Sequence, residues 1–161
     1  MKIAVLSDTH IPKAAKELPD EVIRIVEGAD LVIHAGDYVD ESVIERLKSI
    51  AEFKGVQGNM DPYSICKLLP KKLLLEIKGV RIGVIHGDGS PIGLEKRVMA
   101  AFKNEKIDML IYGHSHTPKN EKIGDVIVFN PGSPTDRFFA PYQSMGIITI
   151  EEEIKPEIIR L

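Results

Sequence analysis

Short apolar segments alternate with segments of helical periodicity over the first third of the chain. Residues 3–6, 31–35 and 53–56 are typical of buried strands. Between them, residues 20–28 and 40–50 place their apolar side chains on one helical face. This order predicts successive β-α-β units, in which the strands are parallel and the connections are right-handed.

The ends of both predicted helices carry local signals. Asp20 and Glu21 lie in the first turn of the first helix, where acidic side chains are favoured, and Gly28 lies at its end. Asp40 can cap the second helix through its side chain. These signals support the two helices independently of the apolar pattern.

The pattern changes after about residue 70, where strands dominate. Lys78 and Gly79 lie between two apolar runs and predict a hairpin turn. The further predicted segments are strands at 73–77, 80–85, 109–112, 126–129, 145–150 and 157–161 and a helix at 93–104. We therefore expect an α/β fold with two mixed β-sheets flanked by helices, a four-layer αββα sandwich formed by residues 1–161 as one domain.

Polar clusters directly follow five of the predicted strands. Ligands bind at the carboxyl ends of strands in open α/β sheets, so we expect the five clusters to meet at one edge. Glycines at positions 36, 58, 87 and 113 allow sharp turns and a close approach of the backbone to a ligand. The clusters occupy residues 7–10, 35–37, 58–61, 86–88 and 113–116.

These clusters consist largely of residues that bind metals. Asp8 and His10 are two residues apart, as are His114 and His116, so in an extended segment each pair could hold one ion. The set of two carboxylates, four imidazoles and one amide oxygen lacks a thiolate, which argues against a structural zinc site. The seven candidate ligands are Asp8, His10, Asp37, Asn59, His86, His114 and His116.

Seven ligands suit two ions that share one carboxylate. Nitrogen and oxygen donors favour Mn²⁺, Fe, Co²⁺, Ni²⁺ or Zn²⁺ over Ca²⁺ or Mg²⁺. Two such ions leave a positive charge that attracts a phosphate ester, and they lower the pKa of bound water to roughly 7. The predicted chemistry is hydrolysis of a phosphate ester by a metal-bound hydroxide.

Composition narrows the classes of function. The chain of 161 residues has a net charge of −3, which gives no electrostatic reason to expect general binding to nucleic acid or to an anionic membrane. No segment approaches the roughly 20 apolar residues of a membrane span. The one cysteine, Cys66, excludes an internal disulfide and fits a cytoplasmic protein. The apolar strands of the tail leave a homodimer open.

In this order, the clusters from Asp8 to His116 resemble those of the calcineurin-like metallophosphoesterase superfamily. The chain length, the compact segment 58–61 and residues 130–133 are similar to the small bacterial and archaeal phosphodiesterase branch. The resemblance implies a four-layer αββα sandwich, in agreement with the strand pattern. It also implies metal-dependent hydrolysis of a phosphodiester, most commonly with Mn²⁺.

The resemblance further implies how the ligands divide between two ions. Asp37 bridges the ions, and Asp37, Asn59 and His86 are the candidate catalytic residues. The first ion is held by Asp8, His10, Asp37 and His116, and the second by Asp37, Asn59, His86 and His114.

One position departs from the larger members of that family. They carry a histidine directly after the metal-binding asparagine, where this chain has Met60, which cannot donate a proton. We therefore expect the substrate to be a small phosphodiester with a good leaving group. Two alternatives are a phosphomonoesterase or phosphoprotein phosphatase, and a catalytically silent scaffold like vacuolar sorting protein 29. The complete ligand set favours an enzyme over the scaffold.

Five further residues are candidates for supporting the site or touching the substrate. His34 is interpreted as a packed histidine or one that orients a ligand. Asp61 can orient a ligand or relay a proton, and Asp88 either supports the site or belongs to a plain turn. Ser133 belongs to a turn or lines the pocket, and Arg137 contacts the substrate phosphate or is a solvated charge.

Overall fold

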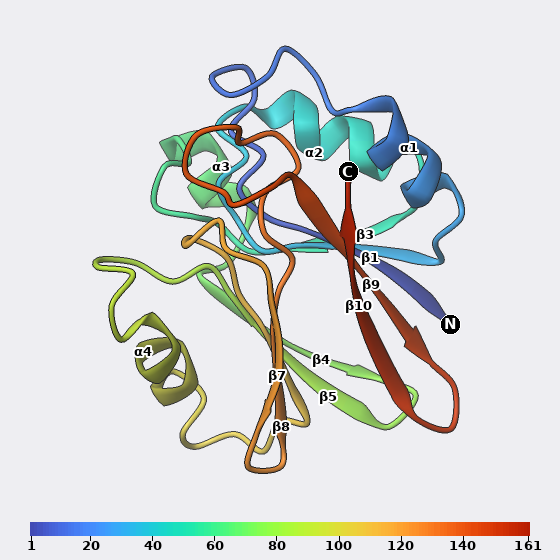
Figure 1. Ribbon diagram of the computed structural model, residues 1–161, viewed down its shortest axis with the longest axis vertical. Helices are drawn as coiled ribbons and strands as arrows, with labels where there is room; N and C mark the ends of the chain where they lie inside the picture. Colours follow the sequence, from blue (N-terminus) through green and yellow to red (C-terminus); the bar gives the residue numbers. More distant parts are fainter.

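Two mixed five-stranded sheets pack face to face in the computed structural model, which describes residues 1–161 (Figure 1). In spatial order, the first sheet contains β10 (Ile154–Arg160), β9 (Ser144–Ile150), β1 (Lys2–Leu6), β2 (Leu31–His34) and β3 (Glu52–Gly55). The second sheet contains β4 (Lys72–Ile77), β5 (Val80–Ile85), β6 (Met109–Ile111), β8 (Val126–Asn130) and β7 (Lys119–Ile123).

Four helices lie outside the two sheets. They are α1 (Asp20–Glu27), α2 (Glu41–Lys48), α3 (Tyr63–Leu68) and α4 (Leu94–Ala100). The first two cover the outer face of the first sheet, and α4 lies on the outer side of the second (Figure 1). The predicted four-layer αββα arrangement is confirmed.

Three apolar clusters hold the layers together. The central cluster lies between the sheets and contains Ile33 and Val84, both fully buried. A second cluster joins the first sheet to its helices through residues such as Val22, and a third joins Val98 of α4 to Leu110 of β6. Because both faces of each sheet are covered, the central strands are apolar along their whole length.

The local signals that mark the helices and the hairpin are confirmed. The Asp40 side chain accepts a hydrogen bond from the Ser42 amide at 2.9 Å and so caps α2. At the hairpin between β4 and β5, Lys78 and Gly79 have φ of 50° and 81°. Two positive φ angles are the requirement of a type I′ turn, whose twist matches the paired strands.

Two elements have no counterpart in the sequence prediction. Helix α3 has 6 residues, too few to show a helical period. Strand β7 has the sequence KNEKI and pairs only with β8 at the edge of its sheet. A polar edge strand carries no apolar alternation, because neither of its faces is fully covered.

The five polar clusters follow strands of both sheets. Three follow β1, β2 and β3 of the first sheet, and two follow β5 and β6 of the second. The strands within each group are parallel, so each group ends on one side. The β4–β5 hairpin begins the second sheet, close to where the apolar pattern changes along the chain.

None of the four helices is long and apolar enough to cross a membrane. The longest of them have 8 residues, whereas a span needs roughly 20.

Replacement of Gly146 by alanine tests the packing of the two sheets. A Cβ atom at this position would lie 2.4 Å from Cε1 of the buried Phe129 on the facing sheet. We expect Gly146→Ala to lower the free energy of unfolding by about 1–3 kcal/mol, the usual cost of overpacking, as measured by urea denaturation in EDTA. Gly28→Ala is the matched control, because its Cβ would have no neighbour closer than 3.6 Å. Equal stability of the two variants would contradict this packing.

Candidate metal centre

The seven candidate ligands converge where the carboxyl ends of the two sheets meet. Asp8 joins the two groups of loops, because its Oδ2 accepts a hydrogen bond from the backbone amide of His114 at 3.0 Å. The amide of Asp8 also donates to the carbonyl of Gly36 at 3.0 Å, which ties β1 to the loop after β2. The site is therefore assembled from loops of both sheets.

The backbone of the site is strained. Asp8, His10, Asp37, His114 and His116 all have positive φ, between 44° and 69°. Residues other than glycine rarely adopt this conformation, which costs on the order of 1–2 kcal/mol each. Five such residues in one place indicate that the surrounding structure is built to hold these side chains in position.

This strain corrects the expected geometry of the two-residue spacings. Neither pair lies in an extended segment, since φ is positive at Asp8, His10, His114 and His116. Asp8 and His10 still point into the same group of donors. The His116 ring faces His10, whereas the His114 ring faces Asn59, so that pair is divided between the two halves of the site.

One group of donors consists of Asp8, His10 and His116. The Nε2 atoms of His10 and His116 lie 3.2 Å apart. They are 3.7 Å and 3.3 Å from Oδ1 of Asp8. Three donor atoms at such distances can all reach one cation placed between them.

A second group consists of Asp8, Asp37 and His86. Oδ2 of Asp37 lies 3.2 Å from Nε2 of His86 and 3.5 Å from Nε2 of His10. Asp37 therefore stands between the two groups, where a bridging carboxylate is expected. Its other oxygen, Oδ1, accepts a hydrogen bond from the amide of Met60 at 2.7 Å.

Asn59 and His114 extend the second group. Nε2 of His114 lies 2.7 Å from the carbonyl oxygen of Gly89, so the ring proton belongs on Nε2 and the lone pair on Nδ1. That Nδ1 atom is 2.9 Å from Oδ1 of Asn59, another acceptor. The ring of His114 packs edge-on against His86, with centroids 5.4 Å apart. Two acceptors that face each other beside a third ligand fit a shared cation.

Two buried polar atoms of the site have no hydrogen-bond partner. They are Oδ1 of Asp8 and Nε2 of His86. Nδ1 of His86 donates to the carbonyl of Ala35 at 2.7 Å, which directs Nε2 toward the carboxylates. A buried polar atom without a partner costs roughly 1–3 kcal/mol. A divalent cation would satisfy both atoms, and the donor set fits one.

The carboxylates shift the titration of the facing histidines in the metal-free protein. Burial by itself lowers the pKa of His86, but Asp8 and Asp37 outweigh it and raise the pKa to about 9. Burial likewise lowers the pKa of His116, while Asp8 and Asp136 raise it to about 9. Burial raises the pKa of Asp8, yet the facing histidines bring it below its usual value. At neutral pH the protons on His86 and His116 thus supply the positive charge that a metal ion would otherwise supply.

Asp61 fixes the loops that carry two of the ligands. Its carboxylate accepts hydrogen bonds from the amides of Asp37 at 3.1 Å and Gly58 at 2.7 Å. It also accepts from Tyr38 and Val39 at 2.7 Å and 2.8 Å. Four such bonds occupy the carboxylate, so the geometry supports the orienting role over the proton relay.

His34 lies fully buried beneath the loop of Asp37. The Gly36 amide donates to its Nδ1 at 3.1 Å, so Nε2 carries the proton and faces the hydroxyl of Thr9 at 3.2 Å. Burial lowers its pKa to about 3, and the ring stacks on Tyr38 with centroids 3.9 Å apart. A neutral, packed histidine fits the interpretation made from its place in the strand.

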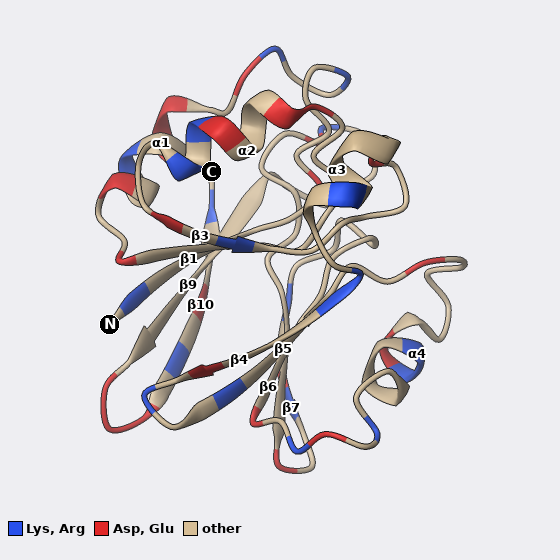
Figure 2. Cartoon of the chain, turned by 180° about the vertical axis from the view of Figure 1, so that it is seen from behind, with Lys and Arg blue, Asp and Glu red and all other residues tan.

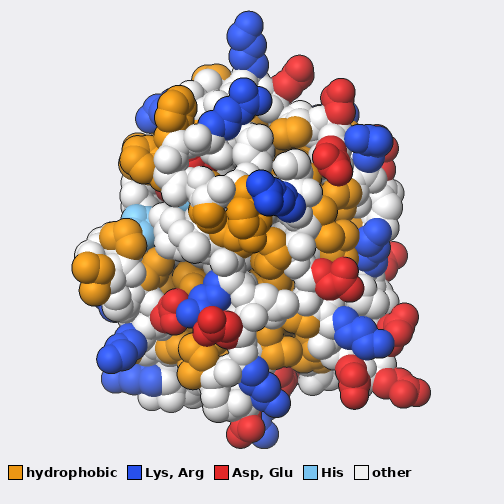
Figure 3. Space-filling view, viewed as in Figure 1, with side chains coloured by type: hydrophobic (Ala, Val, Ile, Leu, Met, Phe, Trp, Pro, Cys, Tyr) orange, Lys and Arg blue, Asp and Glu red, His pale blue; other side chains and the backbone are white.

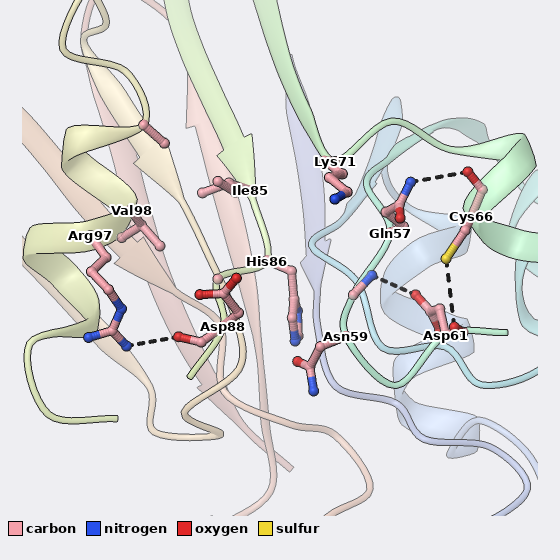
Figure 4. Close-up of a pocket in the computed structure, with 13 residues that line it drawn as sticks. Gln57, Asn59, Asp61, Cys66, Lys71, Ile85, His86, Asp88, Arg97 and Val98 are labelled. Carbon is pink, nitrogen blue, oxygen red and sulfur yellow. Dashed lines mark hydrogen bonds between the residues drawn. The ribbon is translucent and has the colours of Figure 1, made fainter. Parts of the chain in front are cut away.

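The remaining three candidates differ in position. The Ser133 hydroxyl is buried and donates to the carbonyl of Asp8 at 2.7 Å, so it supports a ligand's backbone and does not face the site opening. Asp88 is exposed, and its carbonyl accepts a hydrogen bond from Arg97 (Figure 4). Arg137 is exposed and lines a cavity together with His10 and His116.

The sequence analysis missed Asp136. Its Oδ2 contacts Nδ1 of His116, which directs Nε2 of that ring toward Asp8. A carboxylate behind a metal-binding histidine sets the orientation and basicity of the ring. The distance of 20 residues between Asp136 and His116 gave no local signal.

Fold and site together define a metallophosphoesterase. The model of the calcineurin-like phosphoesterase superfamily domain matches residues 1–153, and the chain belongs to this family. A probable metallophosphoesterase of Methanocaldococcus jannaschii is 39% identical over 99% of this chain and 81% of its own length. A phosphodiesterase of the same organism is 29% identical over 99% of both chains.

A solved structure of another protein has a similar fold. Vps29 of Entamoeba histolytica, as a single mutant, matches with a TM-score of 0.81 and 21% identity. The match covers 100% of this chain and 99% of that one. At this identity the similarity concerns the fold alone.

Metal binding is expected to release protons. His86 and His116 are protonated at pH 7 because their pKa values are raised from 6.5 to about 9. We expect about two protons to leave when Mn²⁺ binds at pH 7, since a ligating imidazole must be neutral. Titration calorimetry in buffers of different ionisation enthalpy measures this number. The release should vanish as pH rises above about 9, and affinity should fall at lower pH.

The raised pKa values of His86 and His116 also make the stability of the metal-free protein depend on pH. These raised pKa values contribute stability that is fully present below pH 6.5 and is lost as pH rises through about 9.

Absence of proton release on Mn²⁺ binding at pH 7 would contradict the pairing of both histidines with the carboxylates.

Asp136→Asn tests the carboxylate behind His116. The asparagine retains an oxygen for the amides of Phe138 and Phe139, which now donate to Oδ1 at 2.8 Å and 3.1 Å. We expect Mn²⁺ affinity to fall by roughly 10–100-fold, because the ring loses its anionic partner. Competition with a fluorescent chelator measures the Kd. Asp125→Asn, at an exposed turn, is the control and should leave the Kd unchanged.

Proposed function

We propose that this protein is a metal-dependent phosphodiesterase that hydrolyses a small phosphodiester with two bound divalent transition-metal ions. The observation that carries the proposal is the convergence of the donors on Asp8 and Asp37, with Oδ1 of Asp8 and Nε2 of His86 buried without a hydrogen-bond partner. Buried groups of this kind need charge compensation, which a bound cation would supply in place of the histidine protons.

The geometry supports a division of the ligands around Asp37. Asp8, His10, Asp37 and His116 would hold the first ion, and Asp37, Asn59, His86 and His114 would hold the second. Mn²⁺ is the proposed metal, with Ni²⁺, Co²⁺, Fe or Zn²⁺ as alternatives of the same donor preference. Two bound ions supply a water of lowered pKa and positive charge for the phosphoryl oxygens.

Asp37, Asn59 and His86 are the residues to which we assign the catalytic role. Asp37 lies between the two histidine groups, with its Oδ1 held by the Met60 amide at 2.7 Å. His86 is held by the Ala35 carbonyl at 2.7 Å. Asn59 lies beside His86 at the wall of a cavity, where its amide can contact a phosphoryl oxygen (Figure 4).

Two cavities border the centre and favour a diester over a monoester. One, of about 510 Å³, is lined by Asn59 and His86, and the other, of about 290 Å³, is lined by His10 and His116. The two cavities have no lining residue in common. A phosphodiester has two organic groups on its phosphorus, whereas a monoester would leave one cavity unused.

The residue after Asn59 supports a substrate with a good leaving group. The Met60 side chain is 46% exposed and has no proton to donate. A leaving group of low pKa departs without protonation, so its hydrolysis does not need an acid at this position.

The charge distribution supports a small substrate over a nucleic-acid polymer. The net charge is −3, and Figure 2 shows basic and acidic residues interspersed over both sheets and the helices. A polymer-binding surface instead needs clustered positive charge along the backbone of the ligand.

Hydrolysis of bis(4-nitrophenyl) phosphate tests the proposal. We expect activity with Mn²⁺, none in EDTA, and a kcat/KM that exceeds that for 4-nitrophenyl phosphate. Asp37→Asn should lower kcat/KM at least 100-fold, because it removes the shared anionic ligand. Asp125→Asn, the same replacement at an exposed turn, should keep the wild-type rate.

Three outcomes would count against the proposal. Full activity of Asp37→Asn would exclude the two-ion scheme, and faster turnover of the monoester would assign a phosphomonoesterase. Metal binding without turnover of either ester would favour the alternative of a catalytically silent scaffold.

A further inference from the structure

The smaller of the two cavities at the metal centre has an aromatic wall. It is about 290 Å³ in volume, and its walls include His10, His116, Lys13, Arg137, Phe138 and Phe139. We refer to it as the aromatic cavity. The ring centroid of Phe139 lies 6.5 Å from that of His116, in an edge-on arrangement. The aromatic wall therefore directly adjoins a candidate metal ligand.

Phe138 and Phe139 are exposed to an unusual degree for large apolar side chains. Their exposed fractions are 92% and 85%. Figure 3 shows hydrophobic side chains in several places on one face of the molecule, among charged side chains. Exposed apolar groups around a polar centre are typical of a ligand-binding site.

The loop that carries these phenylalanines is held in place by the metal site. The Asp136 carboxylate accepts hydrogen bonds from the amides of Phe138, Phe139 and Ala140 at 2.8, 3.1 and 3.0 Å. The same carboxylate contacts Nδ1 of His116. One buried carboxylate thus positions both His116 and the aromatic wall. The position of the phenylalanines relative to this candidate metal ligand is therefore fixed by the same contacts.

The charges of the aromatic cavity favour an anion. Lys13 and Arg137 are exposed at its walls, and neither forms an ion pair. Its one acidic residue, Asp136, is occupied by His116 and the backbone amides. The cavity therefore presents aromatic faces together with two unpaired cations.

The larger cavity has a different chemistry. Its lining has no aromatic ring other than the imidazole of His86, and its charged side chains include both Lys71 and Asp88. Its Arg97 is already bound to carbonyl groups, those of Ile92 at 2.9 Å and Asp88 at 2.8 Å (Figure 4). A ligand that is both aromatic and anionic is therefore matched by the aromatic cavity, because the larger cavity offers no face for an aromatic ring to stack on.

We propose that the aromatic cavity is the subsite for the nucleoside arm of a nucleotide phosphodiester. The base stacks on Phe138 and Phe139, as bases do on exposed aromatic side chains in other nucleotide-binding proteins. Lys13 and Arg137 face the negative charge of the phosphodiester, and the leaving group lies toward the larger cavity. This assignment rests on the proposed phosphodiesterase function and specifies its substrate class.

Two substrates with the same leaving group test the subsite. Thymidine 5′-(4-nitrophenyl phosphate) and methyl 4-nitrophenyl phosphate differ only in the second arm. We expect the wild type with Mn²⁺ to prefer the nucleotide ester by roughly tenfold or more in kcat/KM, the size of a base-stacking contribution. In the double variant Phe138→Ala/Phe139→Ala this preference should disappear, while the rate on the methyl ester stays unchanged.

The controls separate the subsite from the rest of the molecule. Ile123→Ala removes an exposed apolar side chain of β7 and should keep the preference. Arg137→Gln should lower kcat/KM for both esters and keep the preference, because both carry the same phosphodiester anion. A double variant that retains the preference, or that slows both substrates equally, would overturn the subsite.

A binding measurement distinguishes failure of the subsite from failure of the phosphodiesterase. If neither ester releases nitrophenolate, the proposed function fails, and binding of thymidine 5′-monophosphate to the metal-free protein then decides on the subsite. We expect the double variant to bind this nucleotide at least tenfold more weakly, and equal binding would overturn the proposal. Sedimentation velocity tests a further explanation of the exposed phenylalanines. A wild type that dimerises while the double variant stays monomeric would assign them to a contact between two copies of the chain, and would overturn the subsite.

Discussion

The buried carboxylates of Asp8 and Asp37 set the main constraint on this structure, because each lies against imidazole rings out of contact with solvent. A buried charge is tolerated only when an opposite charge or several hydrogen bonds compensate it. Here the histidines supply that charge in the metal-free protein, through pKa values raised to about 9 at His86 and His116. The same groups present lone pairs to a cation once the protons leave. The histidine protons thus balance the carboxylates in the absence of metal, and the same atoms can bind a cation.

The two-sheet architecture follows from the need to hold these groups together. Loops after β1 and β2 supply the carboxylates, and loops after β5 and β6 supply His86 and His114, so neither sheet alone contains the centre. Packing of the central apolar cluster keeps the two sets of loops in register. Disturbance of the sheet interface therefore acts on the chemistry as well as on the stability.

Two acidic side chains organise the loops around the ligands. Asp61 binds the amides of the loop that carries Asp37, and Asp136 binds both His116 and the loop of Phe138. Neither acid faces a candidate ion, yet both decide where the ligands point. Such supporting groups convert a set of suitable residue types into a site of defined geometry.

The sequence by itself determined the αββα layers, the caps of α1 and α2 and the hairpin at Lys78, and it indicated the seven candidate donors, because these depend on short-range periodicity, turn chemistry and residue type. The tertiary structure decided which strands join each sheet, that His114 and His116 face different halves of the site, and that Asp136 supports His116. It also revealed β7, whose polar sequence carries no strand pattern. These features depend on contacts between residues distant in the chain and on positive φ angles that packing imposes, neither of which a local pattern encodes.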